Sequence, residues 1–111
     1  MSHNSFTKEN RLTTEKDFSR VYRDGRRYEG DFFVFYLLEK EEGKPRIGIV
    51  TPKQIGSAVE RNRVKRIIRE SFRKNKSIFD SYDFIVKPKK EVIDFNNPVL
   101  AERFREDFPA H

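Results

Sequence analysis

The spacing of apolar residues changes along the chain between a helical period and a strand-like one. From Phe18, apolar residues recur at i, i+3 and i+4, after a Thr-x-x-acid capping box that opens at Thr14 and before Gly25. Glycine is common where helices end, so this pattern predicts a helix over 15–24.

Strand-like segments follow in the middle of the chain. Residues 31–39, DFFVFYLLE, are rich in β-formers, and apolar residues occupy both the odd and the even positions. This pattern predicts a strand that is covered on both faces or that faces a ligand on one of them. A turn over 41–45 leads to 46–52, which we predict to be the paired strand. Another strand is predicted over 82–88, and a short one around 26–30 is weakly indicated.

Two further helices carry clear start signals. Ser57 opens a second capping box, SAVE, before a helix over 58–75. Asn97 is placed as the N-cap and Pro98 as the first residue of a helix over 97–108. The order helix, strands, helix, strand, helix predicts an α+β fold.

Composition supports one folded domain. The 111 residues suffice for a single modest core, so we predict one domain over 1–111, with residues 1–9 flexible. Eleven Phe and four Tyr predict an aromatic core, and the absence of Cys excludes a disulfide framework. No segment reaches the roughly 20 apolar residues of a membrane span, and no signal-like run opens the chain. We therefore expect a cytoplasmic protein that is not inserted in a membrane.

The positive charge is concentrated in one segment. The whole chain has a net charge of +6, and residues 60–76 alone contain eight Lys or Arg against two Glu, also +6. The remainder is neutral overall. A neutral body with one cationic segment indicates a polyanionic partner, with nucleic acid the first candidate and an anionic lipid surface the second.

On a helical wheel, this segment has one apolar side and one cationic side. Cations at i, i+4 repel one another, whereas a merely solvated face normally mixes signs, so the pattern favours nucleic-acid contact over simple solvation. The apolar sector contains Val64, Ile67, Ile68, Ser71 and Phe72. The opposite sector contains Asn62, Lys65, Arg66, Arg69 and Arg73, with Arg61 and Arg63 at its margins.

The same stretch, IGSAVERNRVKRIIRESFR, closely resembles the signature of the bacterial ribonuclease P protein subunit, whose hallmark is Arg-Asn-Arg, here residues 61–63. Upstream, NRLTTEKDFSRVYRDGRR is similar to the opening helix of that family, and the resemblance covers about 10–108. It implies the two-layer α/β sandwich found in the second domain of a small-subunit ribosomal protein. That fold has the order αβββαβα and a left-handed βαβ crossover, where general topology rules favour a right-handed one.

The resemblance also implies a function. The protein would join a catalytic RNA that removes the 5′ leader from precursor tRNA by Mg²⁺-dependent hydrolysis, with the active site and the Mg²⁺ mainly on the RNA and no cofactor bound tightly by the protein. The implied contacts with the catalytic RNA are Arg61, Asn62, Arg63, Lys65, Arg66, Arg69 and Arg73. The implied leader-binding cleft contains Phe18, Tyr22, Tyr36, Lys53 and Lys65.

Some of these residues have a simpler interpretation. Phe18 and Tyr22, at i and i+4 of one helix, could be core residues, and Lys53 could be an ordinary surface lysine. The chain departs from the family at Gln54, where a second basic residue is frequent, and in its last residues, FREDFPAH, which lack a basic tail.

No protein active site is predicted. The two histidines, His3 and His111, lie near the chain ends, and the acidic pairs Glu41-Glu42 and Glu106-Asp107 have no converging partners for acid–base or two-metal chemistry. We therefore predict no catalytic residue and no metal site in the polypeptide. Two alternatives remain: a structural, ribosomal-type RNA-binding protein, and a helix-turn-helix DNA-binding module. The latter is disfavoured because it needs two short consecutive helices.

Overall fold

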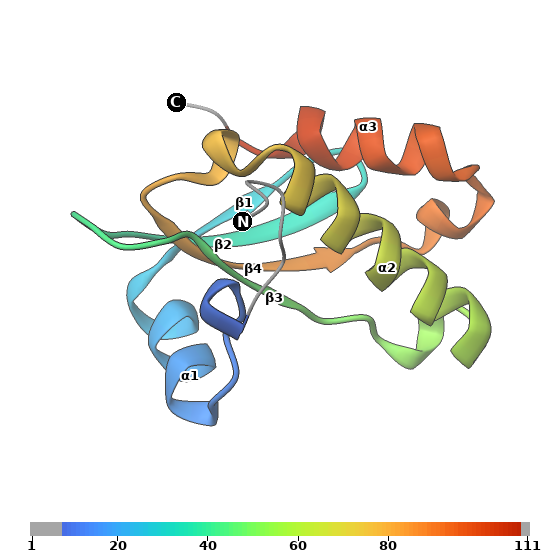
Figure 1. Cartoon of the computed structure of the whole chain (residues 1–111). Helices are drawn as coiled ribbons and strands as arrows, with labels where there is room; N and C mark the ends of the chain where they lie inside the picture. Colours follow the sequence, from blue (N-terminus) through green and yellow to red (C-terminus); the bar gives the residue numbers. More distant parts are fainter. Residues whose placement is uncertain (1–7, 110–111) are drawn as a thin grey trace.

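Helices and strands follow the predicted order αβββαβα. The computed structural model describes residues 8–109 (Figure 1). Of the nine N-terminal residues expected to be flexible, 1–7 lie outside the described part, and 8 and 9 begin a short 3-10 helix. The helices are α1 (Glu15–Asp24), α2 (Ala58–Lys74) and α3 (Asn97–Asp107). The strands are β1 (Arg26–Glu29), β2 (Phe33–Glu39), β3 (Arg46–Ile49) and β4 (Tyr82–Pro88), and the 3-10 helices are η1 (Lys8–Asn10), η2 (Lys53–Ile55), η3 (Lys76–Phe79) and η4 (Lys90–Asp94).

The sheet has the strand order β1-β2-β4-β3, with β4 antiparallel to β2 and parallel to β3. The prediction that residues 46–52 pair with 31–39 is therefore wrong, because β4 separates the two strands. Residues 83–86 of β4 are all buried, and a strand covered on both faces belongs inside a sheet, whereas the four-residue β3 lies at its edge. The strand predicted over 46–52 ends at Ile49, and Pro52, which has no backbone N–H to donate, comes just before η2.

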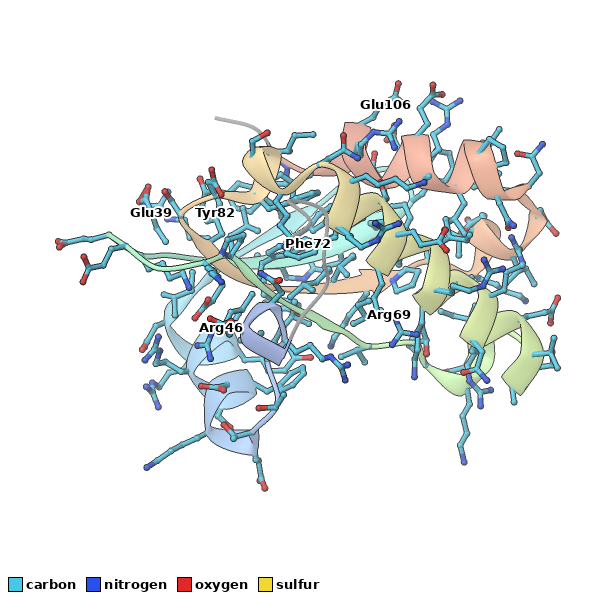
Figure 2. The ribbon with its side chains drawn as sticks, in the orientation of Figure 1. Glu39, Arg46, Arg69, Phe72, Tyr82 and Glu106 are labelled. Atoms are coloured by element: carbon cyan, nitrogen blue, oxygen red, sulfur yellow. The ribbon has the colours of Figure 1, made fainter. Side chains whose placement is uncertain are left out.

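Helices α2 and α3 cover one face of this sheet (Figure 1). Between them and the strands lies the predicted aromatic core, in which the Phe79 ring stacks on Phe84 at 5.3 Å and on Phe104 at 5.4 Å between centroids. Figure 2 shows Phe72 projecting from α2 into this layer. The predicted apolar sector of α2 is confirmed, since all five of its residues are buried: Val64, Ile67, Ile68, Ser71 and Phe72.

Helix α1 lies on the opposite face of the sheet, where Val21 packs with Leu12 and Ile85. In Figure 1, β3 lies in front of β4 and α2 lies above both strands. The chain thus leaves β3, rises to α2, returns and descends into β4 behind β3, which is the left-handed crossover that the family resemblance implied.

The helix N-termini are mostly capped as predicted. The Ser57 hydroxyl accepts from the Glu60 N–H at 3.2 Å, and the Glu60 carboxylate accepts from the Ser57 N–H at 3.0 Å, so this capping box is complete. Thr14 caps α1 by accepting from the Asp17 N–H. For α3 the prediction is wrong by one residue: Asn96 is the N-cap, because its side-chain oxygen accepts from Val99 N at 3.0 Å, and Pro98 is the second helical residue.

A buried ionic cluster ties α1 to the sheet. Asp83 of β4 is 1% exposed, and its carboxylate accepts from the Arg46 guanidinium at 2.6 and 3.1 Å and from Lys40 Nζ at 2.8 Å. Arg46 also reaches Asp17 of α1 at 3.3 Å, and Arg20 of α1 lies 3.7 Å from Asp83. Burial acts to raise the pKa of Asp83, but hydrogen bonds from Arg46 and Lys40 outweigh it and lower that pKa below its ordinary value.

Candidate nucleic-acid interface

The outward face of α2 carries the predicted cations. Asn62, Arg66 and Arg69 are exposed, and the remaining predicted RNA-contacting residues of this helix are half-buried. Figure 2 shows Arg69 projecting from α2 on the side of β3. The half-buried residues are Arg61, Arg63, Lys65 and Arg73. The wheel of the sequence therefore describes the folded helix, with its apolar side on the core and its cations toward solvent.

Carboxylates compensate this charge only weakly. Helix α2 contains seven Lys or Arg and two Glu. Glu60 is engaged in the capping box, and Glu70 lies 3.8 Å from Arg66 in a pair whose side chains are about half exposed. Exposed i, i+4 pairs of this kind stabilise a helix by only about 0.3–0.5 kcal/mol. The outward face of α2 thus keeps a clear positive excess, which favours a polyanionic partner.

Two of the predicted RNA contacts make hydrogen bonds inside the protein. Arg63 donates to the Phe95 carbonyl at 3.1 Å, to the Ile93 carbonyl at 3.0 Å and to the Asn97 side-chain oxygen at 2.8 Å. Arg61 donates to the Gly56 carbonyl at 2.8 Å. Arg63 therefore fastens α2 to the segment before α3, a structural role that its place on the wheel did not indicate. A guanidinium has five N–H donors, so RNA contact by Arg61 and Arg63 stays a prediction.

A narrow groove runs between α1, the edge of the sheet and α2. Its volume is about 180 Å³, and it brings Phe18 together with Lys65, which were both predicted for the leader cleft. Arg69 lines the same groove from α2, and Arg11 lines it from the segment before α1. The remaining lining residues are Leu12, Ile47, Gly48 and Ile49. An aromatic ring beside three cations suits a single-stranded nucleic acid, which offers base faces and phosphates together.

Phe18 lies directly on the sheet because β3 has a glycine beneath it. A Cβ atom added at Gly48 would lie 2.6 Å from Cε1 of Phe18, closer than real side chains approach. The ring is half-buried and packs against the Val21 cluster, so it has both a core side and a groove side. The core interpretation of Phe18 is therefore confirmed for one side of the ring, and leader contact by the other side stays a prediction.

The other two predicted leader aromatics contact each other. The rings of Tyr22 from α1 and Tyr36 from β2 meet edge to face, with 4.8 Å between centroids, and Tyr22 is 38% exposed. Lys87 of β4 places its Nζ 4.8 Å from the Tyr22 centroid and 5.4 Å from that of Tyr36. Sequence reasoning missed Lys87. Its position could have been inferred from the alternation of side chains along β4, which places residue 87 on the same face as Ile85.

The remaining predicted residue, Lys53, lies apart from the groove. It begins η2, is exposed, and is followed by the exposed Gln54. Arg11 was also missed, although it lies in the stretch NRLTTEKDFSRVYRDGRR that carries the resemblance. Its place in the groove depends on the parallel bridge between Arg11 and Ile47 of β3, which sequence spacing does not reveal.

Between residues 8 and 109, no group of three or more His, Asp or Glu side chains is arranged to hold a metal ion. His3 and His111 lie outside that range. None of the helices that the structure describes has the length and apolar character of a membrane span.

Comparisons with known proteins identify relatives of this chain. The family model described as Ribonuclease P matches residues 6–108. The ribonuclease P protein component of Desulforapulum autotrophicum is 38% identical over 109 residues, which are 97% of this chain and 93% of the relative. That of Thermotoga maritima is 34% identical over 106 residues, covering 94% and 84% of the two chains. The solved structure of the Staphylococcus aureus RNase P protein superposes with a TM-score of 0.81 at 32% identity, covering 90% of this chain and 93% of that one.

Proposed function

Because this chain belongs to the ribonuclease P protein family, we propose that it binds the catalytic RNA of ribonuclease P and helps this RNA to remove the 5′ leader from precursor tRNA. The members of this family are the protein subunits of an endoribonuclease that contains RNA. The observation that carries this proposal is the pairing of two surfaces, the cationic face of α2 and the aromatic groove beside it.

The cationic face of α2 is the proposed contact with the catalytic RNA. Arginine is well suited to this contact because its planar guanidinium donates two parallel hydrogen bonds to phosphate oxygens. Arg66 and Arg69 are both exposed and come from successive turns of the helix. A shallow hollow of about 570 Å³ lies along this face, and its lining consists of Val59, Asn62, Arg63, Arg66 and Arg69.

The groove and the tyrosine pair are the proposed contacts with the leader. Phe18, Tyr22 and Tyr36 offer ring faces or edges to bases, and Lys65 offers charge to phosphates. Such contacts accept any sequence, because every base has a π-face and every linkage has a phosphate. A leader of variable sequence is therefore a suitable ligand. Lys53, exposed at the start of η2, is proposed as an outlying contact.

In this proposal the polypeptide binds and positions, and the RNA performs the hydrolysis. The RNA supplies the active site and binds the Mg²⁺ ions, while the cations of α2 reduce the repulsion between the enzyme RNA and the tRNA precursor. We propose the cytoplasm as the place of this reaction.

Reconstitution tests the proposal. The protein is combined with a bacterial ribonuclease P RNA at low millimolar Mg²⁺, and the affinities for a precursor tRNA and for the same tRNA without its leader are measured, together with the cleavage rate. We expect the protein to increase both cleavage and the preference for the precursor. Equal affinity for the two tRNAs, with the protein bound to the RNA, would favour a purely structural RNA-binding protein. Unchanged cleavage would contradict the proposal.

A further inference from the structure

Lys87 lies on the sheet face that α1 covers only in part. Side chains 83, 85 and 87 of β4 point to this face in succession. Asp83 is buried in the ionic cluster and Ile85 is buried against Val21, whereas Lys87, one step further along the strand, is half-buried. Its register partner on β2 is Val34. Lys87 is thus a cation on a largely apolar face of the sheet, next to α1.

Two aromatic rings hold the ammonium group of Lys87. Its Nζ lies over both the Tyr22 ring and the Tyr36 ring, at 4.8 and 5.4 Å from their centroids. The edge-to-face contact of the two rings fixes them relative to each other. A ring face attracts a cation through its quadrupole but carries no net charge. The rings therefore orient the ammonium without neutralising it.

The next lysine along the chain, just after β4 ends, is held differently. Lys89 donates to Glu29 at 2.8 Å, and Arg27 lies 3.4 Å from the same carboxylate. These contacts, the one from Lys89 above all, lower the pKa of Glu29. Over residues 8–109, no ion pair joins Lys87 to a carboxylate. Of the two lysines, Lys89 is paired with a carboxylate, whereas Lys87 has no carboxylate partner within residues 8–109.

We propose that Lys87 binds a backbone phosphate of the single-stranded leader and that Tyr22 and Tyr36 position its ammonium for this contact. The proposal rests on the proposed function, because it takes the leader as the ligand of the tyrosine pair. An ammonium has three N–H donors, and the faces of the two rings leave donors for phosphate oxygens. A leader passing from the Phe18 groove across the tyrosines would meet Lys87 as its next uncompensated cation.

The test uses the assembled holoenzyme and compares Lys87→Gln with the unchanged protein. We expect Lys87→Gln to weaken binding of precursor tRNA about threefold to tenfold at low salt, and to leave the affinity for leaderless tRNA and for the catalytic RNA unchanged. The slope of log affinity against log salt should fall by about 0.7, the value for one single-strand phosphate. Lys87→Arg should retain most of the affinity. Lys16→Gln, at an exposed lysine of α1, is the matched control and should change nothing.

Neutral methylphosphonate linkages in the leader locate the contact. In the unchanged protein, one linkage should weaken binding when it is made neutral, and in Lys87→Gln that same linkage should have no effect. Tyr22→Leu should weaken binding of precursor tRNA more when Lys87 is present than in the Lys87→Gln background, because the Tyr22 ring positions the Lys87 ammonium. Full leader preference in Lys87→Gln, or an unchanged salt slope, would overturn the proposal and leave the proposed function intact. A holoenzyme with no leader preference at all would overturn both.

Discussion

The molecule has two groups of Lys and Arg side chains, one around Asp83 and one on α2. They are the same residue types, but their charges are compensated to very different degrees. Arg46 and Lys40 converge on a carboxylate that is 1% exposed, and their charge is compensated inside the protein. Arg66 and Arg69 are exposed on a helix whose two carboxylates compensate little of its charge. The two groups differ in their acid partners, a buried carboxylate for Arg46 and Lys40 and a half-exposed one for Arg66.

This contrast explains how one small chain can stay folded and, in the proposed function, also bind a polyanion. The Asp83 cluster joins α1, which carries Phe18 and Tyr22, to strands β3 and β4. Arg66 and Arg69 lie on α2, which is separated from α1 by the edge strand β3. Compensated charge therefore fixes the wall of the groove, and the exposed charge of α2 is left for the proposed RNA partner.

The largest expected effect comes from removing the buried carboxylate. Asp83→Asn should lower the free energy of unfolding by about 3 kcal/mol, because Arg46 and Lys40 would lose the charge that balances them. The value is at the lower end for a broken buried pair because both cations keep some contact with water. Urea unfolding measures it. Asp24→Asn, which breaks the exposed pair with Arg23, is the control and should cost under about 0.5 kcal/mol.

The pH dependence gives an independent check on Asp83. Its folded pKa is lowered, so its contribution to stability is fully present above the unfolded value of about 3.9 and is lost as the pH falls through the folded pKa. The stability difference between the unchanged protein and Asp83→Asn should therefore be constant from about pH 5 to 7 and shrink below about pH 4. A difference that stays constant into strong acid would contradict the role given to this carboxylate.

The next effect concerns the contact between α1 and the sheet. Gly48→Ala should destabilise the protein by about 2 kcal/mol, because the new Cβ would lie 2.6 Å from Cε1 of Phe18 and would displace the ring. Leader affinity should fall as well, since Phe18 lines the groove. Thermal unfolding and binding of precursor tRNA measure the two losses. In a Phe18→Leu background the same substitution should cost clearly less, and equal costs in both backgrounds would exclude the ring as the cause.

Much of the fold could be predicted from local signals. The helix over 15–24 and the buried sector of α2 follow from apolar periodicity and capping residues, which act over a few neighbouring positions. The pairing of 46–52 with 31–39 was wrong because strand neighbours depend on a long-range choice: the chain returns through α2 and inserts β4 between the two strands. The left-handed crossover came only from the family resemblance.

The site shows the same division between local and long-range information. The cationic face of α2 could be predicted, because a helical wheel is a local property. The atoms that accept hydrogen bonds from Arg63 belong to residues 30 to 34 positions away along the chain. The structural role of Arg63 could therefore not be predicted from the sequence. Lys87 joins Tyr22 and Tyr36 only because three separate elements meet on one sheet face.

The smallest expected effects separate two arginines of the same helix. Arg63→Ala should cost about 1–1.5 kcal/mol of stability, because it leaves the carbonyls of Ile93 and Phe95 without this donor. Arg69→Ala should cost under about 0.5 kcal/mol, since Arg69 is exposed on the helix surface. For binding to the catalytic RNA the order should reverse, with Arg69→Ala lowering the log–log salt slope by about 0.9 and Arg63→Ala lowering it less. Urea unfolding and RNA titrations at several salt concentrations on the two variants decide the matter. Equal slopes for the two variants would mean that internal hydrogen bonding does not predict which cations contact the RNA, and the contrast with the Asp83 cluster would then hold for stability alone.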